Sequence, residues 1–251
     1  MKEYHVFDAI YCSECEIFRK VVIDETLNRI SNGSIGRDEN QDLNIVKRLS
    51  FIDNPENYFD YFDYLFLKNE SVQLVGDITP SYSMLSSNAY NHIKEGLESR
   101  GFKVKVVFLM RDPFERIWSM IRMNRKVRLL NGFQLVIDEE EELRDVYYRP
   151  EVSLRTRYDR TIEELEKVFD KSDIFYGYYE NLFTEEIISR LSEFLSIELE
   201  DPDFHYKVNE SPKSTLISDG LREEIINYYK SVYKFLSIKS KGYTDSIWSK
   251  Y

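Results

Sequence analysis

The segment of the chain that best suits chemistry runs from Val106 to Ser119 and reads V-V-F-L-M-R-D-P-F-E-R-I-W-S. Its apolar residues are typical of a buried strand, and Asp112 followed by Pro113 is typical of a helix start. Arg111 would then leave the carboxyl end of the strand, where its guanidinium can grip a phosphate through two N–H groups. Ser119, about two turns into the helix, offers a hydroxyl donor. The pattern is therefore that of an anion site.

The same residue types also fit a purely structural role. Arg111 can pair with Asp112 at the helix start, and Ser119 can bond back to its own helix. In the anion-site interpretation, we expect the first N–H groups of the helix and the positive end of its dipole to face the ligand. Arg116 shares a face with Ser119 because the two lie three residues apart. Geometry alone supports the two interpretations equally.

Composition points to one domain over residues 1–251, because 42% of the 251 residues are hydrophobic and suffice for one sizeable core. The formal net charge of -11 excludes a general nucleic-acid binder, which needs a basic surface. Between Arg100 and Arg128, however, nine Lys or Arg face only Asp112 and Glu115. One basic segment in an acidic protein indicates a local anion site.

The sequence also argues against membrane and metal chemistry. No stretch approaches the roughly 20 apolar residues of a membrane helix, and the N-terminus lacks an apolar signal core, so we expect a cytoplasmic protein. Cys12 and Cys15 are the two cysteines of the chain. They exclude a disulfide framework and supply at most half of a four-ligand zinc site, so we expect no metal.

Alternating helices and strands predict an α/β fold with a mostly parallel central sheet flanked by helices. The apolar run at 103–110 is typical of a central strand covered on both faces. Shorter strands are expected at 72–75 and 174–178. The aromatic stretch 56–67 predicts a helix packed on several sides. Further helices are expected over 80–100, 113–131, 154–169, 184–196 and 219–236.

The spacing R-D-P-x-x-R-x-x-S resembles the 3'-phosphate-binding motif of sulfotransferases that use 3'-phosphoadenosine 5'-phosphosulfate (PAPS). Three other stretches agree in order and distance. K-E-Y-H-V-F-D at 2–8 resembles the family's K-E-x-H-F-F-D, and G-D-I-T-P-S-Y at 76–82 resembles its G-E-K-T-P-x-Y loop. Y-Y-E-N-L at 178–182, followed by F-L-S-I, resembles its Y-E-D-L and F-L-G-L. The resemblance covers nearly the whole chain, and its pattern is nearest to glycan (heparan-type) and bacterial sulfotransferases.

This resemblance implies a sulfotransferase architecture like that of the P-loop nucleotide kinases. Arg111 and Ser119 would bind the 3'-phosphate of PAPS, with adenosine 3',5'-bisphosphate as the product and no metal. Glu3 would be the general base for a hydroxyl acceptor, a carbohydrate or small metabolite, with His5 beside it. Lys213, in N-E-S-P-K-S-T, would lie over the donor; an exposed lysine in a turn is the alternative.

Two departures from the family pattern matter. The glycine-rich K-x-G-T-T loop that cradles the 5'-phosphosulfate has no counterpart, so we expect the first strand and the phosphate loop to be missing. Ile78 stands where many relatives have a lysine. A catalytically impaired, sulfotransferase-like nucleotide- or glycan-binding protein is therefore the alternative function. A nucleoside or sugar kinase is disfavoured because G-x-x-x-x-G-K-[ST] is absent. Tyr158 fits either a ligand contact or the core.

Overall fold

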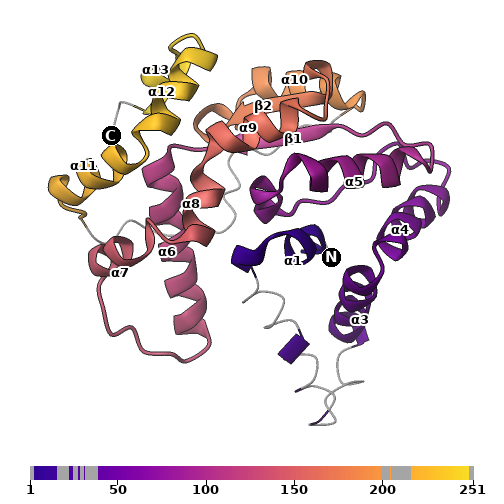
Figure 1. Ribbon diagram of the computed structural model, residues 1–251, viewed down its shortest axis with the longest axis horizontal. Helices are drawn as coiled ribbons and strands as arrows, with labels where there is room; N and C mark the ends of the chain where they lie inside the picture. Colours follow the sequence, from indigo (N-terminus) through magenta and orange to yellow (C-terminus); the bar gives the residue numbers. More distant parts are fainter. Residues whose placement is uncertain are drawn as a thin grey trace. The chain divides into compact units, whose positions relative to one another are not determined.

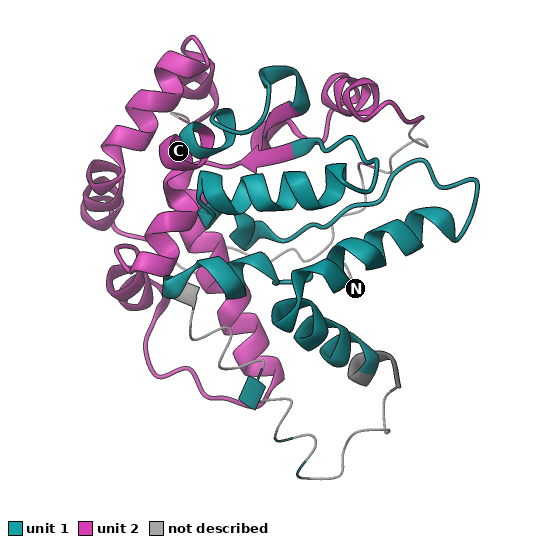
Figure 2. Ribbon diagram, turned by 45° about the vertical axis from the view of Figure 1, so that its right-hand side comes forward, with its two compact units in different colours: residues 1–106, 163–173 teal, residues 107–162, 174–251 magenta. Residues whose placement is uncertain are grey.

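The computed structural model describes residues 3–15, 23–24, 28, 31, 39–198, 204 and 216–248. The chain divides into two compact units, drawn in two colours in Figure 2. The first unit comprises residues 1–106 and 163–173, and the second comprises 107–162 and 174–251. Figure 1 labels the main elements along the chain.

Helices are the main regular elements of the first unit in the part that the structure describes. Its elements are α1 (Phe7–Tyr11), η1 (Ser13–Cys15), α3 (Glu39–Asp53), α4 (Pro55–Leu67), η2 (Pro80–Met84), α5 (Ser87–Glu98), η3 (Lys171–Asp173) and the last residues of α9 (Tyr158–Glu166). Local signals explain where these helices begin and end. Asn54 caps α4 by accepting a 3.2 Å hydrogen bond from the N–H of Glu56, and Gly101, with φ of 83°, follows α5.

Aromatic rings form much of the core of the first unit. Phe7 meets Tyr58 edge-on with ring centroids 4.9 Å apart, and Tyr58 lies 4.6 Å from Phe62. Rings of α4 therefore anchor the short helix α1. The expected packing of this aromatic helix on several sides is wrong. Tyr64 and Leu67 are exposed, so α4 buries one face.

The second unit holds the sheet and the remaining helices. Its elements are β1 (Val106–Met110, from residue 107), α6 (Pro113–Leu130), α7 (Glu139–Val146), α8 (Pro150–Thr156), the first turn of α9, β2 (Ile174–Tyr178), η4 (Tyr179–Asn181), α10 (Glu185–Leu195), α11 (Asp219–Tyr228), α12 (Lys230–Lys239) and α13 (Tyr243–Trp248). Helix α6 begins where Asp112 and Pro113 predict, and its Phe114, Ile117 and Ile121 are buried in the core.

The fold is helix-rich, with a small parallel sheet of two strands, β1 and β2, in the part that the structure describes. This agrees with the α/β class, whereas the kinase-like sulfotransferase architecture stays a prediction. The expected strand at 72–75 is wrong, since these residues have no regular structure. The expected burial of β1 on both faces is also wrong. Met110 is buried, but Val107 and Leu109 are 39% and 44% exposed.

Three of the predicted long helices are each divided in two. Leu85 is extended between η2 and α5. Arg157, with ψ of 65°, separates α8 from α9, and Tyr229, with ψ of 16°, separates α11 from α12. Periodicity continues across each break because buried residues such as Tyr229 keep facing the core. The spacing of apolar residues therefore predicted which face of each helix is buried, but it did not predict the residue at which the helix is interrupted.

Candidate functional site

Arg111 lies in the turn that joins β1 to α6. Its Nη2 is 3.3 Å from Oε2 of Glu115, one turn into α6, and its guanidinium stacks over the Tyr179 ring at 4.6 Å from the centroid. The Glu115 side chain is buried, whereas that of Arg111 is 24% exposed. Arg111 thus pairs with Glu115 rather than Asp112. A partly exposed guanidinium fixed on two sides can still reach a ligand from its open side.

The backbone N–H groups at the start of α6 have protein partners. The N–H of Glu115 donates to Oδ1 of Asp112 at 2.9 Å, and the N–H of Phe114 donates to the hydroxyl of Tyr233 at 3.4 Å. That hydroxyl in turn donates to Oδ2 of Asp112 at 3.1 Å. The expectation that these N–H groups face a bound anion is therefore wrong. The donors left for an anion are side chains.

Asp112 is a buried carboxyl group with a strongly altered acidity. Burial raises its pKa to about 6, and the nearby charges of Glu115 and Glu180 act in the same direction. Hydrogen bonds from the Glu115 backbone and from Tyr233 offset part of this rise. Asp112 caps α6 and so positions the turn that carries Arg111.

Glu180 connects two of the sequence motifs. Its Oε1 accepts a 2.9 Å hydrogen bond from the backbone N–H of Asp112. The Y-Y-E-N-L stretch therefore contacts the R-D-P turn directly, and Tyr179 of the same stretch stacks on Arg111. Sequence reasoning assigned no role to Glu180 or Tyr179. Both residues lie in the Y-Y-E-N-L motif. The occurrence of this motif after the R-D-P motif, in the order that the family shows, was the signal that could have identified them.

Ser119 and Arg116, one turn apart on α6, have different surroundings. Ser119 is half-buried and makes no hydrogen bond to any residue that the structure describes, so back-bonding to its own helix is not seen there. Arg116 is engaged, because its Nη2 donates to the carbonyl of Val152 at 3.0 Å and its Nε to Oγ1 of Thr156 at 3.1 Å. Arg116 is therefore structural. The convergence of Arg111 and Ser119 on one ligand stays a prediction.

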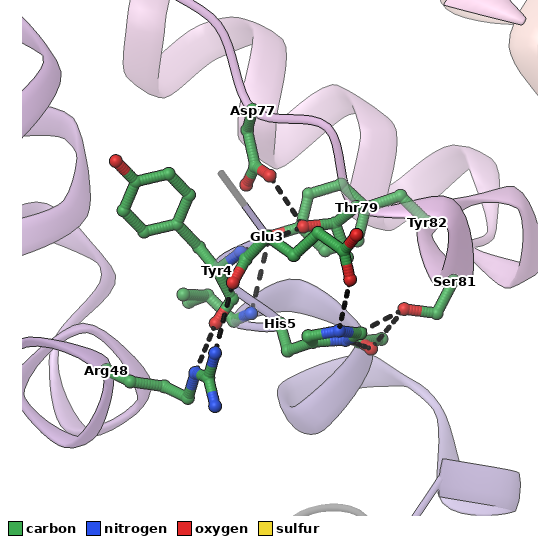
Figure 3. A network of polar contacts seen from close by, with 10 residues as sticks. Glu3, Tyr4, His5, Arg48, Asp77, Thr79, Ser81 and Tyr82 are labelled. Carbon is green, nitrogen blue, oxygen red and sulfur yellow. Dashed lines mark hydrogen bonds and ion pairs between the residues drawn. The ribbon is translucent and has the colours of Figure 1, made fainter. Parts of the chain in front are cut away.

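In the first unit, Glu3 and His5 belong to a connected set of polar side chains (Figure 3). Oε2 of Glu3 is 3.5 Å from Nε2 of His5, and Nδ1 of His5 is 2.8 Å from Oδ2 of Asp8. The Ser81 hydroxyl lies 3.1 Å from the same Nδ1 and also donates to Asp8. Burial alone would raise the pKa of Asp8, but hydrogen bonds from His5 and Ser81 hold it below its ordinary value.

The segments 2–8 and 76–82 are held together by further bonds in Figure 3. The N–H of Tyr4 donates to Oγ1 of Thr79 at 3.0 Å, and Thr79 donates to Asp77 at 2.5 Å. Arg48 of α3 donates to the Tyr4 carbonyl at 2.9 Å. A bond between residues 75 positions apart therefore joins the two motifs in one local structure.

His5 has a left-handed backbone, with φ of 53°. This conformation costs of order 1 kcal/mol for a residue other than glycine, and such strain clusters at functional sites. It lets the ring lie between Glu3 and Asp8. The Glu3 side chain remains 41% exposed, so its carboxylate can reach a substrate.

The other predicted site residues are placed as follows. Lys213 lies outside the described residues. Tyr158 is buried in the core and packs against Phe108, which favours the structural interpretation. Glu3 belongs to the first unit and Arg111 to the second.

Among the described residues, no group of three or more His, Cys, Asp or Glu could hold a metal ion. None of the helices described is long and apolar enough to cross a membrane. Comparison of the chain with protein-family models, curated proteins and solved structures found no match.

Proposed function

We propose that this protein transfers a sulfuryl group from PAPS to a hydroxyl acceptor, a carbohydrate or a small metabolite. The observation that carries the proposal is the way the four motif segments pair. Segments 2–8 and 76–82 bond to each other in the first unit, and the R-D-P turn bonds to Glu180 in the second. Segments chosen for their resemblance to one family thus form two local structures, which supports a common function for them.

The donor's 3'-phosphate fits the groups around Arg111. This guanidinium is partly exposed and fixed by Glu115 and Tyr179, and the hydroxyl of Ser119 makes no hydrogen bond within the described part of the chain. Such fixed donors suit a phosphate because little ordering is needed on binding. PAPS supplies the sulfuryl group, and the chain binds and orients it.

Glu3 is the proposed general base. The acceptor oxygen forms a bond to sulfur while the bond from sulfur to the donor's phosphate oxygen breaks, and the acceptor's proton passes to the Glu3 carboxylate. His5 positions that carboxylate at 3.5 Å. Base catalysis of this kind contributes roughly 10²–10⁴-fold. The leaving group is adenosine 3',5'-bisphosphate.

Ile78 favours the second candidate, a binding protein without catalysis. Its apolar side chain is 67% exposed where the resemblance places a lysine beside the transferred group. A transfer assay with radiolabelled PAPS and a panel of glycans separates the candidates. Transfer supports the enzyme, whereas binding of adenosine 3',5'-bisphosphate without transfer supports the binding protein.

Calorimetry with adenosine 3',5'-bisphosphate tests the site itself. Arg111→Ala should weaken binding by about 1.5–3 kcal/mol, the range for hydrogen bonds to charged groups. Arg144→Ala is the matched control, since Arg144 is an exposed arginine of the same unit that pairs with Glu224. Adenosine 5'-monophosphate, which lacks the 3'-phosphate, should bind more weakly to the parent protein. Equal affinity for both nucleotides, or unchanged affinity in Arg111→Ala, would refute the proposal.

A further inference from the structure

The buried carboxylate of Glu115 lies close to two arginines, one from the turn before α6 and one from helix α11. Besides Arg111, Nη2 of Arg222, on α11, lies 3.9 Å from Oε1 of Glu115. The guanidinium of Arg222 also stacks on the Phe114 ring at 4.4 Å. The Arg222 side chain is 22% exposed and that of Glu115 only 3%. Two guanidinium groups are thus within 4 Å of one buried carboxylate, and both arginine side chains are partly exposed.

A third arginine, Arg122, belongs to the same cluster. It lies seven residues after Glu115 and three after Ser119, which places all three on one face of α6. Its guanidinium stacks over the Trp118 ring at 4.6 Å. Burial lowers the pKa of Arg122, and the charge of Arg111 acts in the same direction, whereas the carboxylates of Glu115 and Glu139 oppose it.

Arg122 has bonding capacity that the described residues do not use. The residue is 7% exposed, and its Nε and Nη1 are buried without any hydrogen-bond acceptor in the described part of the chain. Buried donors are nearly always paired, because an unpaired one forfeits its bonds to water. An unpaired donor pair on a cationic side chain therefore points to an anionic ligand.

We propose that Arg122 and Arg222 join Arg111 and Ser119 in binding a phosphomonoester dianion, with Glu115 positioning the arginines. The three guanidinium charges exceed the charges of the two buried carboxylates, Glu115 and Glu139, that act on the cluster. Such a cluster prefers a doubly charged phosphomonoester to a singly charged sulfate ester or phosphodiester. Applied to PAPS, this inference rests on the proposed function and assigns the cluster to the 3'-phosphate.

Phenyl phosphate and phenyl sulfate test the preference, since they share shape but differ in charge at about pH 8. Calorimetry should give the parent protein on the order of tenfold tighter binding of phenyl phosphate. Arg122→Gln and Arg222→Gln should each weaken that binding roughly 10- to 100-fold. Lys126→Gln is the matched control, because it removes one positive charge from an exposed position of α6 and should change affinity less than about twofold.

Arg222→Gln keeps the test decisive if Arg122→Gln does not fold, because the Arg222 side chain is partly exposed. The inference is overturned if phenyl phosphate binds no more tightly than phenyl sulfate. It is equally overturned if both glutamine variants bind phenyl phosphate like Lys126→Gln, which would leave Arg122 a structural partner of Trp118.

The outcomes for the cluster and for the proposed function differ. In one outcome, both variants bind phenyl phosphate more weakly, but the parent binds adenosine 5'-monophosphate as tightly as adenosine 3',5'-bisphosphate. This outcome supports the phosphate-binding cluster and refutes its assignment to PAPS. If the parent transfers sulfuryl groups from PAPS but both variants keep full affinity for adenosine 3',5'-bisphosphate, the cluster fails alone.

Discussion

Replacing Asp112 by asparagine should remove a pH dependence from the stability of the second unit. Burial raises the pKa of Asp112 from 3.8 to about 6, so between these values the folded protein holds a proton that the unfolded chain has released. The stability from this proton is fully present below about pH 4 and is lost as the pH rises through about 6. At about 1.4 kcal/mol per pKa unit, the shift of about two units corresponds to about 3 kcal/mol.

Asparagine suits this test because it resembles the protonated acid. Its carbonyl oxygen can accept from the Glu115 N–H as Oδ1 of Asp112 does, and its amide can donate to the Tyr233 hydroxyl. Urea unfolding should be followed by tryptophan fluorescence between about pH 4 and pH 7.5. Trp118 and Trp248, the two tryptophans of the chain, are both buried in the second unit. The free energy of unfolding of Asp112→Asn should gain about 3 kcal/mol relative to the parent across this range.

Asp138→Asn is the control, because Asp138 caps α7 by accepting from the Glu141 N–H at 2.8 Å but is exposed. This variant measures how replacing an exposed capping aspartate changes the free energy of unfolding over the same pH range. A difference between Asp112→Asn and the parent that does not change with pH would refute the reasoning. A variant that loses stability as the pH rises would show that hydrogen bonds to the ionised Asp112 outweigh its burial.

Two further predictions concern the first unit. Glu3→Gln keeps the size of the side chain but removes the base. Turnover with PAPS should therefore fall by roughly 10²-fold or more, while the donor affinity measured by calorimetry changes little. Equal turnover in the variant and the parent would show that Glu3 is not the base. Gly96→Ala should destabilise the unit by about 1–3 kcal/mol in urea unfolding followed by circular dichroism, because a Cβ there would lie 2.3 Å from the Phe59 ring. Gly76→Ala, with nothing within 4 Å of its Cβ, is the control, and an equal loss in both variants would contradict the packing explanation.

Several elements could be predicted because their signals are local. Asp112 and Pro113 mark the start of α6, and the predicted strand at 174–178 coincides with β2. The predicted strand at 72–75 failed because a strand needs a neighbour to pair with, which local composition does not supply. The exposure of Val107 in β1 likewise depends on what covers the sheet, and an apolar run alone cannot report this.

For the site, the sequence predicted that Arg111 follows a strand and precedes a helix, and the structure places it there. Its contacts were not predicted. Glu180 supports the turn from 68 residues away, and Arg222 comes from a helix near the C-terminus. Neither has a sequence pattern that specifies which group it contacts.

The sequence by itself determined the order of the four motif segments and the start of helix α6, because capping and turn formation act between residues a few positions apart. Tertiary structure alone decided that segment 2–8 bonds to 76–82 and that the R-D-P turn bonds to Glu180. It also decided that Arg116 donates to Thr156, whereas Nε and Nη1 of Arg122 have no acceptor among the residues that the structure describes. These outcomes depend on which groups packing brings within hydrogen-bond distance, and two arginines on one helix differ in this respect only after the chain has folded.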